Sequence, residues 1–495
     1  MTWRAAARGA DEAARAAACE GVLLQMEAER IDTVRVGWCD LHGSLRGKTL
    51  VAGAVAGALE SGVGMVSTIL LKDTSDRTAY RVFEGAAGAA PAGFGFANNV
   101  VLRLDPTSFR VLPWSPSTGW IRAEACFEDG TPVPIDTRRV LQAALARLAA
   151  RGLGLQCGLE VEFHIYRLTA LEEDRSLDPA RAAWPGEPPQ VTMIHPGYNL
   201  LAEAWADLAD EPLAIVRATA EGLGLPLRSL EIELGPSQVE AVFEPSDALT
   251  AADRMVLFRN GVRQALRRAG YHASFVCRPP FPNVMASGWH LHQSLVDLAS
   301  GANAFVRDAP APGSEDDDAS YTLSDVGAGW LAGLLAHARA AAPFCAPTLN
   351  AYARFRPNAM APQAVGWGRD NRGAMLRVLG RAGDPGTRIE NRIGEPMANP
   401  YLYFASQVHA GLDGIERELA APRSVGAPYV AGAGEPLPAS LGEAVDALTA
   451  DAELVRAFGP EVVEWFCRIK RSEIERHAAA EDSDAWQARE YFSRF

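Results

Sequence analysis

The alternation of apolar and polar residues predicts three kinds of element along the chain. Residues 1–30 have the spacing of an amphipathic helix. The run 31–51 alternates apolar and polar positions before a glycine-containing turn, which is typical of a β-hairpin. Residues 137–151 predict another amphipathic helix, with Val140 and Leu148 on one side. Helices and hairpins therefore both contribute to the fold.

The arrangement of these elements favours the α+β class. After residue 151, short strands and longer helices mix without the regular strand–helix alternation of a doubly wound sheet. The breakers Pro113 and Pro116 predict a domain boundary. We therefore expect a helical extension over 1–30, a small β-rich domain over 31–115 and a large domain over 116–495.

Composition limits the functions that this chain can have. Its 495 residues include 47 Lys and Arg against 61 Asp and Glu, a formal net charge of −14, which argues against nucleic acids or anionic membranes as partners. Seven scattered cysteines without a CxxC pair indicate neither a disulfide framework nor a structural zinc site. The first residues lack a signal-peptide core, and the longest apolar run is broken by His337 and Arg339. We expect a cytoplasmic protein without a membrane-spanning segment.

Four strand-like segments carry ionisable side chains on one face. On a strand, residues two apart point to the same side. The residues concerned are Glu160 and Glu162, Glu231 and Glu233 with Glu240 beyond a turn, His290 and His292, and Arg388, Glu390 and Arg392. In a single such strand, the ionisable residues most often form the solvent-exposed face of an antiparallel sheet. Several carboxylates on one face repel unless cations neutralise them, and oxygen ligands with one or two imidazoles suit Mg²⁺ or Mn²⁺.

A basic segment accompanies these carboxylates. Residues 354–392 contain eight arginines and three acidic residues, a local charge of +5 in an acidic chain. A solvated basic face is one interpretation. Beside divalent metals, however, arginines form the usual apparatus of phosphoryl transfer, in which catalysis consists of positioning and charge neutralisation. The Walker and protein-kinase motifs do not occur in the sequence.

Six ordered motifs resemble those of the glutamine synthetase family, in particular its γ-glutamyl amide ligases such as the γ-glutamylanilide and γ-glutamylpolyamine synthetases. The motifs are GLEVEF, ELGPSQVE, SGWHLHQSL, NAYARFRPNAMAP, WGRDNRGAMLRV and RIENR. The resemblance implies an N-terminal β-grasp domain and a catalytic domain with a curved antiparallel sheet. It also implies self-association into stacked rings, as a dodecamer, in which one subunit's N-terminal domain completes its neighbour's active site.

The resemblance further implies a role for each matching residue. The family's ligands of the first metal correspond to Glu162, Glu233 and Glu240. Those of the second metal correspond to Glu160, His290 and Glu390. The residues expected to bind the glutamate substrate are Arg354, Arg392, Glu162 and Ala286. Those expected to bind ATP are His292, Ser294, Arg372, Arg377 and Arg388. Asp40, supplied by a neighbouring subunit, matches the carboxylate that helps to deprotonate the amine, so that Asp40, Arg372 and Glu390 form the expected catalytic set.

The implied reaction has two steps, with ATP as co-substrate and Mg²⁺ or Mn²⁺ as cofactor, at two or more ions per site. ATP phosphorylates the γ-carboxylate of glutamate, and an amine then attacks the acyl phosphate and expels phosphate. Metals and arginines offset the repulsion between the two anionic substrates.

The departures from the family pattern bear on the amine. Met360 stands where ammonia-using members carry a glutamate, and a methionine offers soft apolar surface instead of a charge. Met285 and Ala286 replace Asn and Gly in the segment that touches glutamate, and Glu395 replaces an aspartate. Because an aromatic amine is mostly neutral at pH 7, we expect a small apolar or aromatic amine such as aniline, bound near Asp40 and Met360 and with Trp289 as a further candidate neighbour.

Four alternatives stay open at this stage. The amine is a polyamine or ethanolamine, or Met360 reflects neutral drift in an ordinary ammonia-using glutamine synthetase. A change at Met285 and Ala286 also allows a different acid substrate. The last alternative is that the chain is a catalytically silent, ring-forming relative, against which all six expected metal ligands are present.

Overall fold

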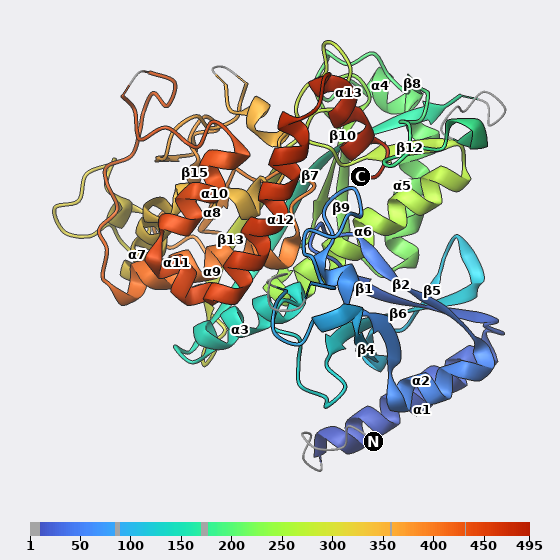
Figure 1. Ribbon diagram of the computed structural model, residues 1–495. Coiled ribbons are helices and arrows are strands. Elements are labelled where there is room, and N and C mark those ends of the chain that lie inside the picture. Colours follow the sequence, from blue (N-terminus) through green and yellow to red (C-terminus); the bar gives the residue numbers. More distant parts are fainter. Residues whose placement is uncertain (1–9, 85–89, 170–176, 357–358, 431) are drawn as a thin grey trace.

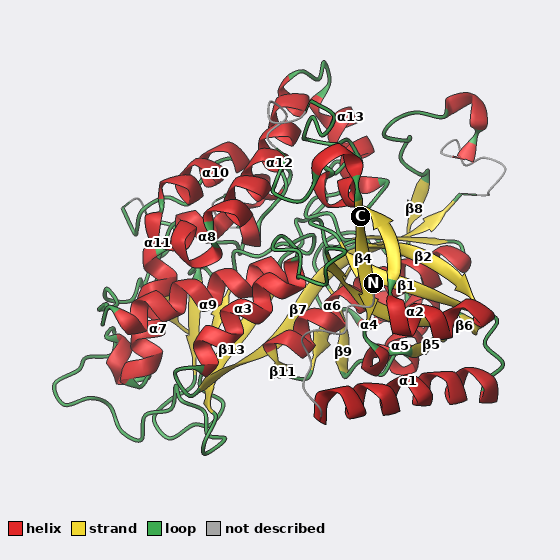
Figure 2. Cartoon of the chain, turned by 60° about the horizontal axis from the view of Figure 1, so that its bottom comes forward, coloured by secondary structure: helices red, strands yellow, loops and turns green. Residues whose placement is uncertain are grey.

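The computed structural model describes residues 10–84, 90–169, 177–356, 359–430 and 432–495 (Figures 1 and 2). Its strands are β1 (Thr33–Cys39), β2 (Leu45–Val51), β3 (Val63–Val66), β4 (Asn99–Leu104), β5 (Arg110–Leu112), β6 (Ser115–Cys126), β7 (Leu153–Leu168), β8 (Val191–Met193), β9 (Leu227–Ile232), β10 (Gln238–Phe243), β11 (Ser246–Asp247), β12 (Tyr271–Ser274), β13 (Trp289–Asp297), β14 (Trp367–Arg369), β15 (Leu376–Leu379) and β16 (Arg388–Asn391).

Its helices are α1 (Ala10–Ala28), α2 (Val55–Ser61), α3 (Thr137–Ala149), α4 (Glu203–Leu208), α5 (Asp210–Gly222), α6 (Ala248–Arg268), α7 (Asp325–Ala336), α8 (Ala338–Cys345), α9 (Pro400–Glu416), α10 (Leu441–Ala450), α11 (Ala452–Phe458), α12 (Pro460–Ala478) and α13 (Ser483–Gln487). The part of the chain that the structure describes contains no helix long and apolar enough to cross a bilayer. The helix predicted over 1–30 corresponds to α1, with residues 1–9 outside the described residues, and the helix predicted over 137–151 corresponds to α3.

The first sheet is formed by the N-terminal part of the chain, blue in Figure 1. Strands β1 and β2 pair in antiparallel fashion, which confirms the predicted hairpin. The sheet order is β2-β1-β6-β4-β3, with β5 also paired to β6. Because β6 pairs with β1, this sheet continues to Cys126, past the boundary expected after residue 115. Pro113 lies in the turn before β6 and Pro116 is the second residue of β6, so neither marks the end of the sheet.

The second sheet is large, curved and mostly antiparallel, which confirms the α+β class. Its order is β14-β15-β16-β13-β7-β10-β9, and β7 also pairs with β8, β11 and β12. The long strand β7 therefore joins most of the sheet. Helices α3 and α6 pack against β7, and α9 packs against α3, α6 and α7, so that helices cover one face (Figure 2).

Asp136 joins the first sheet to the helical layer. Its carboxylate caps the N-terminus of α3 by accepting the backbone N–H groups of Arg138 and Arg139. It also accepts the Trp38 indole N–H at 2.8 Å and the Ala125 N–H at 3.0 Å. A single buried carboxylate thus connects β1, β6 and α3. It provides the hydrogen-bond acceptor that the buried N–H groups of these elements need.

His337 lies at the junction of α7 and α8, between two carboxylates. Its Nε2 is 2.9 Å from Asp413 in α9, and its Nδ1 is 2.6 Å from Asp451 at the start of α11. Burial alone would lower the pKa of His337, but its hydrogen bonds to the Asp451 and Asp413 carboxylates raise it overall. The imidazole therefore ties the α7–α8 junction to α9 and to the start of α11.

The contribution of His337 to stability is expected to decrease as the pH rises. A raised folded-state pKa means that this stabilisation is fully present below the unfolded-state pKa and disappears as the pH passes the folded-state value. We expect His337→Gln to lower the thermal midpoint most at pH 5.5, with a smaller difference from wild type at pH 8.5. Thermal unfolding of both proteins across this range measures the difference, and a loss that is equal at every pH would contradict the charge argument.

Candidate active site

Strand pairing brings the predicted acidic and imidazole side chains into neighbouring rows. His290 of β13 lies opposite Glu160 of β7, and His292 lies opposite Glu390 of β16. Glu162 of β7 lies opposite Glu240 of β10. Directly opposed residues of an antiparallel pair project on the same face, so these side chains share one surface. Four adjacent strands, β16, β13, β7 and β10, thus supply these side chains.

The ligand atoms of these residues lie close enough to share metal ions. Three overlapping groups have atoms within 4.8 Å of one another: Glu162, Glu233 and Glu240; Glu160, Glu240 and His290; and Glu160, His292 and Glu390. The first group is the set expected for the first metal. For the second, His290 Nδ1 is 3.6 Å from Glu160 and 3.8 Å from Glu390.

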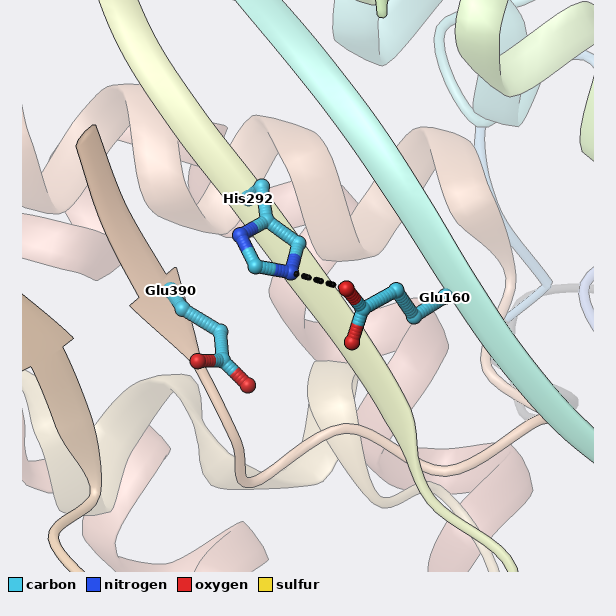
Figure 3. Close-up of side chains that lie close together, drawn as sticks. All are labelled: Glu160, His292 and Glu390. Carbon is cyan, nitrogen blue, oxygen red and sulfur yellow. Dashed lines mark ion pairs between the residues drawn. The ribbon is translucent and has the colours of Figure 1, made fainter. Parts of the chain in front are cut away.

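His292 also belongs to this cluster, although the sequence assigned it to ATP. Its Nε2 lies 2.9 Å from Glu160, and Figure 3 shows both side chains beside Glu390 on three neighbouring strands. The signal was present in the sequence, since the H-x-H spacing places His290 and His292 on one face. Ser294 follows at the next position of that face and is half-buried.

The glutamates carry more negative charge than their surroundings neutralise. Burial, followed by repulsion from Glu162, Glu160 and Glu233, raises the pKa of Glu240 to about 10. Burial and the charge of Glu233 raise the pKa of Glu162 to about 7, and burial also raises the pKa of Glu233. Crowded carboxylates with raised pKa values are those that a divalent cation stabilises in the ionised form.

On the histidine side of the cluster, the pKa values of His290 and Glu160 are lowered and not raised. Burial and the nearby Arg392 lower the pKa of His290 to about 4, so its imidazole is neutral, as metal ligation requires. Burial opposes ionisation of Glu160, but hydrogen bonds from His290 and His292 lower its pKa overall. Oxygen ligands with neutral imidazoles fit Mg²⁺ or Mn²⁺.

Glu162 is fixed by contacts from two other segments. Its carboxylate accepts the Gly288 N–H at 2.8 Å and the Gln238 side-chain amide at 3.1 Å. The same amide contacts the Ala286 carbonyl at 3.4 Å, which ties Ala286 to the cluster. Gly288 must lack a side chain, because a Cβ there would lie 2.4 Å from the Arg354 guanidinium and 3.2 Å from His290.

The two arginines expected to hold glutamate lie beside the cluster and are buried. Arg354 donates to the Arg392 carbonyl at 2.9 Å and lies 3.5 Å from His290. Arg392 pairs with Glu390 through one nitrogen and donates to the Met360 carbonyl at 3.3 Å through another. These contacts join the expected glutamate site, the expected metal site and the Met360 segment.

The arginines expected to contact ATP are arranged along the β15–β16 edge of the cluster. Arg377 donates to Glu390 at 3.0 Å and also pairs with Asp370. Arg388 donates to His292 Nδ1 at 3.1 Å. Arg372 lies in the turn before β15 with an exposed side chain, and the described residues place no carboxylate against it. Glu390, held by Arg377 and Arg392 and near His290, has a lowered pKa despite its burial.

Asp40 is not brought to this cluster within one chain. It lies in the turn between β1 and β2 and is buried. One carboxylate oxygen accepts the N–H groups of His42 and Ser44 at 2.9 Å, and the other pairs with Arg46 at 2.9 Å. Its surroundings are thus those of a structured turn in the N-terminal sheet.

Met360 lies at the edge of the site, in a segment whose backbone conformation is unusual. Its φ of 51° is in the left-handed region, and its side chain is 55% exposed. The Tyr429 hydroxyl donates to the neighbouring Ala361 carbonyl at 3.3 Å. Tyr429 had no motif to identify it, because it comes from a loop far along the chain.

Trp289 was expected as a neighbour of the amine, and the structure corrects this. Trp289 alternates with His290 along β13, so its side chain points to the opposite face. It is fully buried and meets Tyr403 edge-on at a ring-centroid distance of 5.2 Å. Trp289 therefore belongs to the core beneath α9.

Comparison with known proteins agrees with this geometry. The glutamine synthetase catalytic-domain family matches residues 134–491. A γ-glutamylanilide synthase from Acinetobacter sp. is 37% identical over 494 residues, covering 96% of each chain. A γ-glutamylethanolamide synthetase from Streptomyces coelicolor is 32% identical over 467 residues, covering 94% of this chain and 93% of its own.

A solved structure has the same fold. The structure titled GmaS/ADP complex superimposes with a TM-score of 0.73 at 28% identity, covering 94% of this chain and 98% of its own. The curated relatives are named as synthetases and ligases. The chain is therefore a carbon–nitrogen ligase that uses ATP, and it belongs to the glutamine synthetase family.

Proposed function

We propose that this protein joins the γ-carboxylate of L-glutamate to a small apolar or aromatic amine, such as aniline, through a γ-glutamyl phosphate, in amine catabolism. The formation of a γ-glutamyl amide follows from the family and its relatives. The observation that supports the choice of amine is Met360, an uncharged side chain whose backbone carbonyl lies 3.3 Å from Arg392, at the edge of the expected glutamate site.

The residues present fit two divalent metal ions. Glu162, Glu233 and Glu240 would hold one, and Glu160, His290 and Glu390 the other, with His292 close enough to take part. The raised pKa values of the glutamates and the neutral imidazole of His290 are the observations on which this fit depends. When bound, Mg²⁺ or Mn²⁺ supplies neutralisation of the phosphate charge.

The arginines bind and orient the two anionic substrates. Arg354 and Arg392 hold the glutamate beside Ala286, while Arg372, Arg377 and Arg388, with His292 and Ser294, hold the ATP phosphates. An oxygen of the γ-carboxylate attacks the terminal phosphorus of ATP, the bond to the bridging oxygen breaks, and ADP leaves. Positioned guanidinia stabilise the charge that develops in this step.

The amine nitrogen then attacks the γ-carbonyl carbon, and phosphate leaves with the electron pair of the C–O bond. One N–H proton must pass to a base, and we assign this role to Asp40 of an adjacent subunit in a stacked ring of twelve. Within one chain Asp40 pairs with Arg46 and lies outside the cluster, so we assign its action as a base to a contact between subunits. Assembly therefore completes the site in this proposal.

The chemistry of the pocket favours a neutral amine. Ethanolamine and polyamines arrive as cations, and burying a cation requires a carboxylate partner. Met360 supplies none, whereas its thioether makes favourable contacts with aromatic rings. The γ-glutamylanilide synthase similarity, at 37% identity, points to the same class of amine.

A panel of amines tests this proposal directly. With ATP, Mg²⁺ and glutamate, we expect phosphate release to be fastest with aniline among ammonium, ethanolamine, putrescine, isopropylamine and aniline. Phosphate release with ammonium that is as fast as with any organic amine would identify an ordinary glutamine synthetase. Fastest release with ethanolamine or putrescine would identify a cation-binding pocket, and no release with any amine would identify a silent relative.

The Met360 argument makes a separate prediction. Met360→Glu should lower kcat/KM for aniline relative to ammonium by about tenfold, because a carboxylate disfavours an apolar ring and attracts a cation. Met360→Leu is the matched control, since it keeps the apolar surface, and it should retain the wild-type preference. Steady-state kinetics with both amines measure the ratio, and an unchanged ratio in Met360→Glu would refute the role of Met360.

Metal binding is expected to stabilise the protein through the same glutamates. Free metal at about 100 times its Kd should add about 2.7 kcal/mol to the free energy of unfolding. Glu233→Gln should reduce the rise in thermal midpoint on adding Mn²⁺, because it removes a ligand from the first group. Glu244→Gln is the control, as Glu244 follows β10, is exposed and lies outside the three groups. Equal effects of the two variants would contradict the assignment.

A further inference from the structure

The segment of residues 359–361, here named the Met360 segment, is held at two consecutive carbonyl groups. The Met360 carbonyl accepts from Arg392 at 3.3 Å, and the Ala361 carbonyl accepts from the Tyr429 hydroxyl at 3.3 Å. Met360 has a φ of 51°, a conformation that non-glycine residues keep only where surrounding contacts impose it. The two contacts therefore determine where this segment lies.

Only one of the two contacts is free of a competing partner. Arg392 is one of the arginines proposed to hold the glutamate substrate, and it also pairs with Glu390. A substrate carboxylate is a stronger acceptor for a guanidinium than a backbone carbonyl is. When the substrate binds, Arg392 is expected to exchange the Met360 carbonyl for the substrate carboxylate. The Tyr429 hydroxyl is then the remaining contact of the two.

Tyr429 itself is firmly placed by the loop that carries it. The Val425 N–H donates to the Trp367 carbonyl at 2.8 Å, and the Asn371 amide donates to the Val425 carbonyl at 3.1 Å. The ring of Tyr429 packs on Gly373, where an added Cβ would lie 3.1 Å from the ring. The loop thus connects the turn that contains Arg372 to the Met360 segment.

The electrostatic surroundings of Tyr429 include the two arginines of the expected glutamate site. Burial raises the pKa of Tyr429, and Arg392 and Arg354 act on it in the opposite direction from nearby. The hydroxyl stays protonated at neutral pH and is a hydrogen-bond donor to Ala361. The Tyr429 side chain therefore contacts the Met360 segment as a protonated hydrogen-bond donor.

We propose that Tyr429 is a positioning residue that keeps the Met360 segment over the γ-glutamyl phosphate, so that the amine reaches the acyl carbon and water does not. This inference rests on the proposed function and adds a residue that determines its specificity. If the segment opens, water attacks the γ-carbonyl carbon, the C–O bond breaks and phosphate leaves, and glutamate is regenerated. ATP is then consumed without formation of an amide.

The test compares phosphate released with amide formed, using the full-length protein, Mg²⁺, ATP, glutamate and aniline. Wild type is expected to give one phosphate per amide. Tyr429→Phe, which removes only the hydroxyl, should raise this ratio and raise KM for aniline about fivefold, with KM for ATP unchanged. Tyr429→Leu, which also removes the ring, should raise both further.

Tyr321→Phe is the matched control, because Tyr321 is a half-buried tyrosine whose ring stacks under Arg369 and lies outside this site. It should keep the wild-type ratio. A ratio of one in both Tyr429 variants, with wild-type KM values, would overturn the role of Tyr429. The proposed function and this inference fail separately. Absence of amide formation by wild type refutes the proposed function, whereas tight coupling in both Tyr429 variants with wild-type KM values refutes only this inference.

Discussion

Like charges crowded on one face of the second sheet are the constraint on which the rest of the structure depends. Antiparallel pairing places Glu162 opposite Glu240 and Glu160 opposite His290, so the carboxylates cannot separate without breaking the sheet. Repulsion and burial raise the pKa of Glu240 to about 10. The backbone ladder thus maintains an arrangement that side-chain electrostatics alone would disperse, and cations are the natural means of relieving it.

The surrounding residues make sense as responses to this constraint. Arg377 and Arg392 bracket Glu390, while His290 stays neutral beside Arg392. Gly288 leaves room for Arg354 to approach His290. The same guanidinia that balance the glutamates are those proposed to receive substrate, so binding exchanges internal pairs for pairs with glutamate and ATP. The acidic overall charge of the chain says little about this local balance.

Much of this arrangement was predictable from spacing along single strands. Alternation placed Glu160 with Glu162 and His290 with His292 on common faces, and the ordered motifs indicated which strands belong together. The α+β class and the β1–β2 hairpin follow from the same alternation and are confirmed. The end of the first sheet was not predictable from Pro113 and Pro116, because β6 enters the sheet through pairing with β1, which is distant in sequence.

The features that the sequence could not reveal depend on contacts between distant segments. The contact of the Tyr429 hydroxyl with the Ala361 carbonyl joins residues that no local pattern relates. Trp289 was misplaced for the opposite reason, since adjacency to His290 in sequence means opposite faces on a strand. Whether a residue belongs to the site depends on the direction of its side chain and not on its proximity along the chain.

Anomalous diffraction from crystals grown with Mn²⁺ tests the central claim most directly. The account predicts one anomalous peak among Glu162, Glu233 and Glu240 and a second beside Glu160, His290 and Glu390. It also predicts that both peaks disappear after chelation. Absence of peaks at these glutamates, or manganese bound elsewhere on the molecule, would contradict it.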